Sequence, residues 1–196
     1  MNTDSQLELF ETPEVSLGVY CFLLKPAEPT YSLTLEVKAA VDAHLKNSSY
    51  KNKLPHVTLL QFSMNVDHET RLHAAMKRVI LPKNLGAVVE GIKLVKSNST
   101  IVLSLSAQEA VHEFVENLSH ALAIDQVLPK KKSLIKRTKD LRITVGKQLP
   151  VEHVDALMKT LEPMAMQGAV IFNELVLLRS EAGSGPWDTV ATFPLT

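Results

Sequence analysis

The order of predicted strands and helices repeats in the two halves of the chain, and this repetition restricts the folds that it can adopt. Each half reads strand, helix, strand, helix, strand, because short runs rich in Val, Ile and Phe alternate with stretches of helical apolar spacing. The equivalent positions keep a steady offset: Val88 and Val170 are 82 residues apart, and His56 and Arg142 are 86 apart. An internal duplication with little sequence identity explains this offset.

The duplication predicts an α+β fold of two lobes within one domain. Strands are predicted over residues 17–24, 56–62, 87–95, 101–106, 141–146, 169–178 and 190–194, and helices over 32–45, 68–80, 111–122 and 151–161. The single domain would span 16–196, with lobe halves near 16–99 and 100–196 and an exchange of strands between them left open. Residues 1–15 carry four acidic residues and no basic one, which predicts a flexible acidic leader.

Composition limits the partners and the compartment. The 21 Lys and Arg residues balance the 21 Asp and Glu residues, so a nucleic-acid partner would have to be held by a local basic patch. Cys21 is the single cysteine and lies in an apolar run, which favours a core position over a reactive thiol. The start of the chain has no signal-peptide pattern and no apolar run is long enough to cross a bilayer. We therefore expect a cytoplasmic monomer that does not enter a membrane.

The two-fold relation between the lobes predicts where a site would lie. Equivalent strands meet at the axis, and the groove between lobes is a common place for a ligand. Because side chains alternate along a strand, His56 and Thr58 share one face of their strand, and Arg142 and Thr144 share one face of theirs. An imidazole can move a proton near neutral pH, a hydroxyl can hold a phosphate oxygen, and a guanidinium can bind phosphate bidentately. These four residues suit a phosphodiester.

The chain resembles the 2H phosphoesterases, which include the bacterial 2′,5′-RNA ligase-like proteins and cyclic phosphodiesterases. Two H-x-T/S-x motifs on equivalent strands mark this family. The first is intact in Leu54–Leu59, whereas Leu141–Gly146 has an arginine in place of the second histidine but keeps the threonine. The closing segment, with Trp187 and Phe193–Leu195, is also similar. The resemblance implies antiparallel sheets lining a central groove, helices outside, and RNA or a nucleotide with a 2′,5′ linkage or a 2′,3′-cyclic phosphate as partner.

The resemblance also implies roles for the four residues. His56 would be catalytic and transfer a proton, while Thr58 and Thr144 would orient the phosphate. Arg142 cannot transfer a proton, because a guanidinium keeps its proton under these conditions, but it can bind the phosphate. Loss of one general acid or base costs roughly 10² to 10⁴ in rate.

Several interpretations of these residues remain open. The chain can be a slow hydrolase with one histidine or a non-catalytic phosphate- or RNA-binding module. Arg142 can also be an ion-paired arginine, and His56 a structural histidine of an unrelated α+β domain.

A basic segment lies directly before the second motif, with six cations among the ten residues 130–139. It can track the phosphates of RNA or, alternatively, serve only solubility. The predicted nucleic-acid contacts are Lys130, Lys131, Lys132, Lys136 and Arg137, with Trp187 and either Tyr20 or Phe22 stacking on bases unless these aromatic residues belong to the core. No metal site is expected, because the histidines lack the spacing of metal ligands, and no cofactor is expected either.

Overall fold

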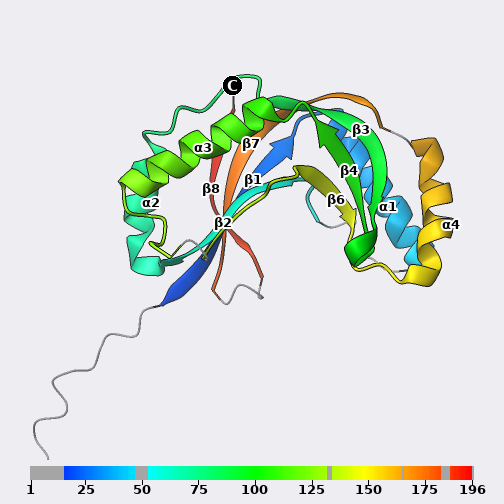
Figure 1. Ribbon diagram of the computed structural model, residues 1–196, viewed down its shortest axis with the longest axis horizontal. Helices are drawn as coiled ribbons and strands as arrows, with labels where there is room; N and C mark the ends of the chain where they lie inside the picture. The colour runs from blue at the N-terminus through cyan, green and yellow to red at the C-terminus, as the bar shows by residue number, and fades with distance from the viewer. Residues whose placement is uncertain (1–15, 47–52, 132–133, 165, 182–185, 196) are drawn as a thin grey trace, which may run out of the picture.

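The computed structural model describes residues 16–46, 53–131, 134–164, 166–181 and 186–195 (Figure 1). The strands are β1 (Leu17–Pro26), β2 (Val57–Asn65), β3 (Gly86–Val95), β4 (Thr100–Ser106), β5 (Ile135–Arg137), β6 (Arg142–Gly146), β7 (Gly168–Ser180) and β8 (Asp188–Pro194). The helices are α1 (Thr30–Leu45), α2 (Glu69–Met76), α3 (Glu109–Ile124) and α4 (Val151–Leu161), with short 3-10 turns at Val66–His68, Lys96–Asn98 and Glu162–Met164. The acidic leader predicted over 1–15 lies outside the described residues.

The described strands form one antiparallel sheet whose order repeats about its centre. The order is β1-β2-β6-β4-β3-β7-β8, with β5 beside β2 and a further pairing of β1 with β7. On one side of β2 and β6 lie β1 and β7, and on the other side lie their equivalents β4 and β3. Val57 pairs with Ile143 at the junction of β2 and β6, and these two residues, which we call the central pair, are 86 positions apart in the chain. The duplicated strands therefore meet at the middle of the sheet.

The helices pack in two pairs, α1 with α4 and α2 with α3. Figure 1 shows one pair at each end of the arched sheet. Each pair takes one helix from each half of the chain, so the two ends of the molecule mix the sequence halves. None of the described helices is long and apolar enough to span a membrane.

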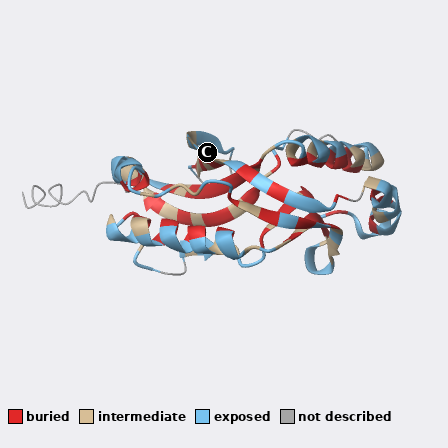
Figure 2. Cartoon of the chain, turned by 90° about the horizontal axis from the view of Figure 1, so that it is seen from above, coloured by how far each residue is buried: buried red, intermediate tan, exposed pale blue. Residues whose placement is uncertain are grey.

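The core lies between the strands and these helices, and Figure 2 shows buried residues along the strands and on the inner sides of the helices. Tyr20, Phe22, Phe62 and Phe172 are its largest fully buried side chains. Tyr20 stacks on Phe62 with ring centroids 5.7 Å apart. Each large apolar side chain buried in this way contributes roughly 1.5–3 kcal/mol to folding.

The segment after β2 differs from the sequence prediction. A helix was expected over 68–80, directly after Asp67, whose side chain is of a type that caps helices, but α2 ends at Met76 and Ile80 is 89% exposed. The side chain of Asn65 caps the preceding 3-10 turn Val66–His68, where it accepts a hydrogen bond from the Asp67 backbone N–H at 3.1 Å, and none of the described side chains caps α2. Asn and Asp are equally good caps, so local composition did not distinguish them.

Candidate active site

Four polar side chains flank the central pair on one face of the sheet. In an antiparallel ladder, the residues on either side of a paired position lie opposite each other, so His56 faces Thr144 and Thr58 faces Arg142. Directly opposite side chains have Cβ atoms about 5 Å apart. The central pair itself is fully buried, whereas all four polar residues are half-buried. We call the face that carries them the site face.

The ring of His56 is held by the backbone just before its strand. Its Nδ1 lies 2.8 Å from the carbonyl oxygen of Leu54. Because a carbonyl can only accept, Nδ1 carries the proton of the neutral ring and Nε2 is left as an acceptor. Burial lowers the pKa of His56, the ammonium groups of Lys38 and Lys53 lower it further, and the bond to Leu54 acts in the opposite direction. At neutral pH the ring is therefore unprotonated at Nε2 and can act as a base.

The guanidinium of Arg142 is available to an anion. Among the described residues, none forms a hydrogen bond or ion pair with the Arg142 side chain or with the hydroxyl groups of Thr58 and Thr144. Arg137, by contrast, binds both carboxylate oxygens of Glu116, at 2.7 and 2.9 Å. A half-buried guanidinium that has no acidic partner within the described part of the chain favours an anion-binding role over the alternative of a structural ion pair.

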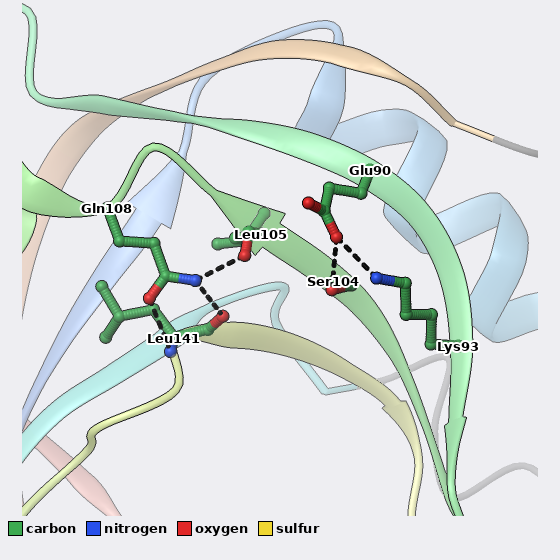
Figure 3. A network of polar contacts seen from close by, with 6 residues as sticks. All are labelled: Glu90, Lys93, Ser104, Leu105, Gln108 and Leu141. Carbon is green, nitrogen blue, oxygen red and sulfur yellow. Dashed lines mark hydrogen bonds and ion pairs between the residues drawn. The ribbon is translucent and has the colours of Figure 1, made fainter.

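The backbone that presents Arg142 is clamped by Gln108, at the start of α3 (Figure 3). The Gln108 side-chain amide donates to the carbonyl oxygens of Leu105 and Leu141, and its oxygen accepts from the Leu141 N–H at 3.1 Å. This single side chain ties the start of β6 to the end of β4. The sequence alone does not reveal this contact, because an isolated glutamine after a strand carries no local signal of it.

A strip of hydroxyl and charged groups borders Arg142. Ser104 pairs with Arg142 across β4 and β6, so its side chain lies on the site face, where it donates to Glu90 at 3.2 Å. Lys93 also binds Glu90, and this ion pair lowers the pKa of the Glu90 carboxyl (Figure 3). A bulge at Gly91, whose φ of 137° suits glycine, turns Glu90 toward this strip. Glu90 is thus a carboxylate at neutral pH and a poor substitute for the absent second histidine.

The basic segment lies beside β2, next to the site. β5, which the sequence analysis did not predict, pairs with β2 over Leu60–Phe62 and places Lys136 opposite Gln61. Lys130 and Lys131 are exposed, whereas Lys132 lies outside the described residues. Arg137 turns to Glu116 on α3. Together with α3, this segment lines a cleft of about 910 Å³ that includes none of the four site residues.

Tyr20 and Phe22, the two aromatic residues of β1 that were candidates for stacking on a base, both lie in the core. Tyr20 is fully buried, and its hydroxyl donates to Glu69 on α2 at 2.8 Å, so the prediction that it stacks on a base is wrong. Phe22 is fully buried as well. Both residues alternate with Cys21 and point to the helices rather than to the site face.

Trp187 is 39% exposed just before β8. The ladder aligns Thr58 with Leu23, Val176 and Thr192 on successive strands, and Trp187 lies five residues before Thr192. That separation is about 17 Å along the strand. The structure therefore does not bring Trp187 to the four-residue site.

Comparisons with known proteins identify solved structures that share this fold. No protein-family model matches the chain, and no curated protein matches its sequence. Crystal structures of E. coli LigT do match: the complex with 3′-AMP has a TM-score of 0.54 and the complex with ATP 0.52, each with 11% identity over 92% of this chain and 99% of LigT. The chain has the LigT fold. A third LigT structure, with NADP⁺, matches at a TM-score of 0.54 and 11% identity.

The LigT fold confirms the predicted fold class, α+β with a 2H-phosphoesterase-like arrangement. The match runs over nearly the full length of both chains although only 11% of residues are identical. The four polar residues of the site face lie on either side of the central pair, where the duplicated strands β2 and β6 meet. Across the described part of the chain, no group of three or more His, Cys, Asp or Glu side chains is placed to hold a metal ion.

Proposed function

We propose that this protein binds RNA or a nucleotide through a 2′,5′-phosphodiester or a 2′,3′-cyclic phosphate and hydrolyses it slowly. The observation that carries the proposal is the guanidinium of Arg142, which has no partner among the described residues and lies across from Thr58 and diagonal to Nε2 of His56. An anion in this position would meet a cation, two hydroxyl groups and a base at once. The nucleotides bound to LigT in its crystal structures support a nucleotide as the ligand class.

The proposed reaction uses one histidine. His56 Nε2 takes a proton from water as the water oxygen forms a bond to phosphorus, and the bond from phosphorus to one ribose oxygen breaks. Thr58 and Thr144 donate hydrogen bonds to the non-bridging oxygens, and Arg142 stabilises the charge that builds up on them. The departing ribose oxygen takes its proton from solvent, because Arg142 cannot give one. Such a reaction would be roughly 10² to 10⁴ slower than one in which a second catalytic residue, a general acid, protonates the departing oxygen.

For RNA, the proposed site extends along the basic segment. Lys130, Lys131 and Lys136 are exposed, and Lys136 lies on β5 beside β2, so these side chains can contact phosphates further along an RNA chain. Trp187 would contact only a ligand of several nucleotides, because it lies about 17 Å along the strand from the level of the site.

A second candidate is a binding module that uses the same four residues without turnover. Arg142 is the observation that favours it, since a permanently charged guanidinium improves ground-state binding of phosphate while removing a proton-transfer group. Both candidates require the same site, so the experiment must measure turnover and binding separately.

The test is a panel of 2′,3′-cyclic nucleotides and 2′,5′-linked oligonucleotides, assayed for hydrolysis and for binding with wild type, H56A and R142Q. Exposed residues of α2 supply matched controls, H73A and R71Q. A hydrolase should show slow turnover that H56A abolishes and H73A keeps. A binding module should show saturable binding that R142Q weakens, without turnover. Neither turnover nor binding across the panel would refute both candidates.

A further inference from the structure

A buried lysine lies beneath the first motif. Lys38, on α1, is 2% exposed, and its ammonium group donates to the carbonyl oxygens of Lys53 at 2.7 Å and Leu54 at 3.2 Å. Asp42, one helical turn further along, is also buried at 4% exposure. Lysine is among the residues least often fully buried, and here its ammonium group binds the loop that leads into the motif.

The carbonyl of Leu54 connects this lysine to the motif histidine. It accepts from Lys38 Nζ and lies 2.8 Å from His56 Nδ1. A carbonyl oxygen has two lone pairs and can serve both donors at once. The ammonium group therefore fixes the direction of the carbonyl, and the carbonyl fixes the imidazole ring.

We propose that Lys38 is a positioning residue that holds His56 in the tautomer with the proton on Nδ1 and keeps Nε2 free to accept a proton. This inference rests on the proposed role of His56 as the base. It extends that role, because it assigns the orientation of the base to a residue of α1 that need not touch the substrate.

The charges around His56 support the same conclusion. Lys38 faces it from α1, where Asp42 acts on Lys38, while Lys53 faces it from the preceding loop and Arg142 lies diagonal to it on β6. On β1, Lys25 follows Leu24, which pairs with Val57, and Lys25 is bound to Glu174 at 3.0 Å. Lys38 and Lys53 both lower the pKa of His56.

The charge of Lys38 itself changes within an accessible pH range. Burial lowers the pKa of Lys38 to about 8, with Lys53 adding to the shift and Asp42 opposing it. Lys38 is therefore mainly charged at pH 7 and mainly neutral at pH 9, and the ring of His56 is unprotonated at both values.

The test measures the ring nitrogens of His56 by ¹⁵N NMR in the ligand-free protein, so its outcome does not depend on turnover. Wild type should show a protonated Nδ1 and a bare Nε2. K38M should raise the pKa of His56, because a nearby cation is lost, and should weaken the tautomer preference, because the Leu54 carbonyl loses its ammonium donor. K38R should stay closer to wild type, and K159M, at an exposed position of α4, should change nothing.

A pH titration of wild type tests the same inference if K38M does not fold. Between pH 7 and 10 the tautomer signal should change with a midpoint near 8, where Lys38 loses its proton. An unchanged signal over that range, or a folded K38M whose His56 matches wild type, would overturn the inference. Failure of the nucleotide panel with this NMR result intact would refute only the proposed function.

Discussion

The replacement of Arg142 by histidine is the substitution for which the structure predicts the largest gain. Arg142 lies opposite Thr58 and diagonal to His56 across β2 and β6, a separation of roughly 7–8 Å between Cα atoms in such ladders. A phosphate held on the site face above the two strands could then contact one imidazole from each strand. The backbone is already fixed, because Gln108 clamps Leu141. R142H should raise turnover by roughly 10² to 10⁴, the contribution of one general acid or base, equivalent to about 3–5 kcal/mol of activation free energy.

The assay is kcat/KM for a 2′,3′-cyclic nucleotide between pH 4 and 9. In wild type only His56 titrates as a catalytic group, so activity should rise with pH through its lowered pKa and level off below pH 8, where Lys38 begins to lose its proton. R142H should give a bell-shaped profile, since one histidine must be neutral and the other protonated. Phosphate affinity should fall, because a permanent cation is replaced by a group that is largely neutral at pH 7.

Two results would refute this reasoning in different ways. If R142H loses the turnover of wild type, Arg142 is itself a catalytic residue. If neither turnover nor phosphate binding changes, Arg142 lies outside any ligand site and the alignment of the second motif is wrong.

Three further predictions follow from individual contacts. Q108A should lower the free energy of unfolding by about 1–3 kcal/mol in urea, because it leaves buried backbone groups of Leu141 unpaired, and an unchanged stability would contradict the clamp. Because the pKa of Lys38 is lowered in the folded protein, the unfolded chain binds more protons than the folded one between pH 8 and 10.5. The free energy of unfolding of wild type should therefore rise by about 3 kcal/mol over that range relative to K38M. Parallel curves of stability against pH for the two proteins would refute this prediction. Replacing Lys130 and Lys136 by Gln should reduce the salt dependence of oligoribonucleotide binding by about 0.7 per lost phosphate contact and leave mononucleotide binding unchanged, whereas equal slopes would exclude these contacts.

The sequence predicted most of the elements because their local signals were strong. α4 was predicted to the residue, and β3 and β4 to within one residue, since alternation and a polar turn at 96–99 mark them. The offset between the halves also predicted which two strands meet at the centre. β5 was missed, because it has one apolar residue in a basic run and forms only by pairing with β2.

The site was only partly predictable, because its support comes from tertiary contacts. Tyr20 stands in an almost continuous apolar strand, where the sequence does not show which face is buried. Lys38 and Gln108 are single polar residues whose partners lie 15 or more positions away in Lys53 and Leu141. Such contacts leave no periodic pattern and become visible only when the strands and helices are placed together.

The most direct test of the central claim is a titration with a nucleoside 3′-monophosphate, followed through the ring nitrogens of His56. If His56 and Arg142 hold one phosphate, the His56 signals should shift to saturation in wild type, and R142Q should weaken the affinity by roughly tenfold or more, as expected for loss of a charged hydrogen bond. R71Q should bind like wild type. His56 signals that do not move at saturating ligand, or equal affinities of R142Q and wild type, would contradict the claim.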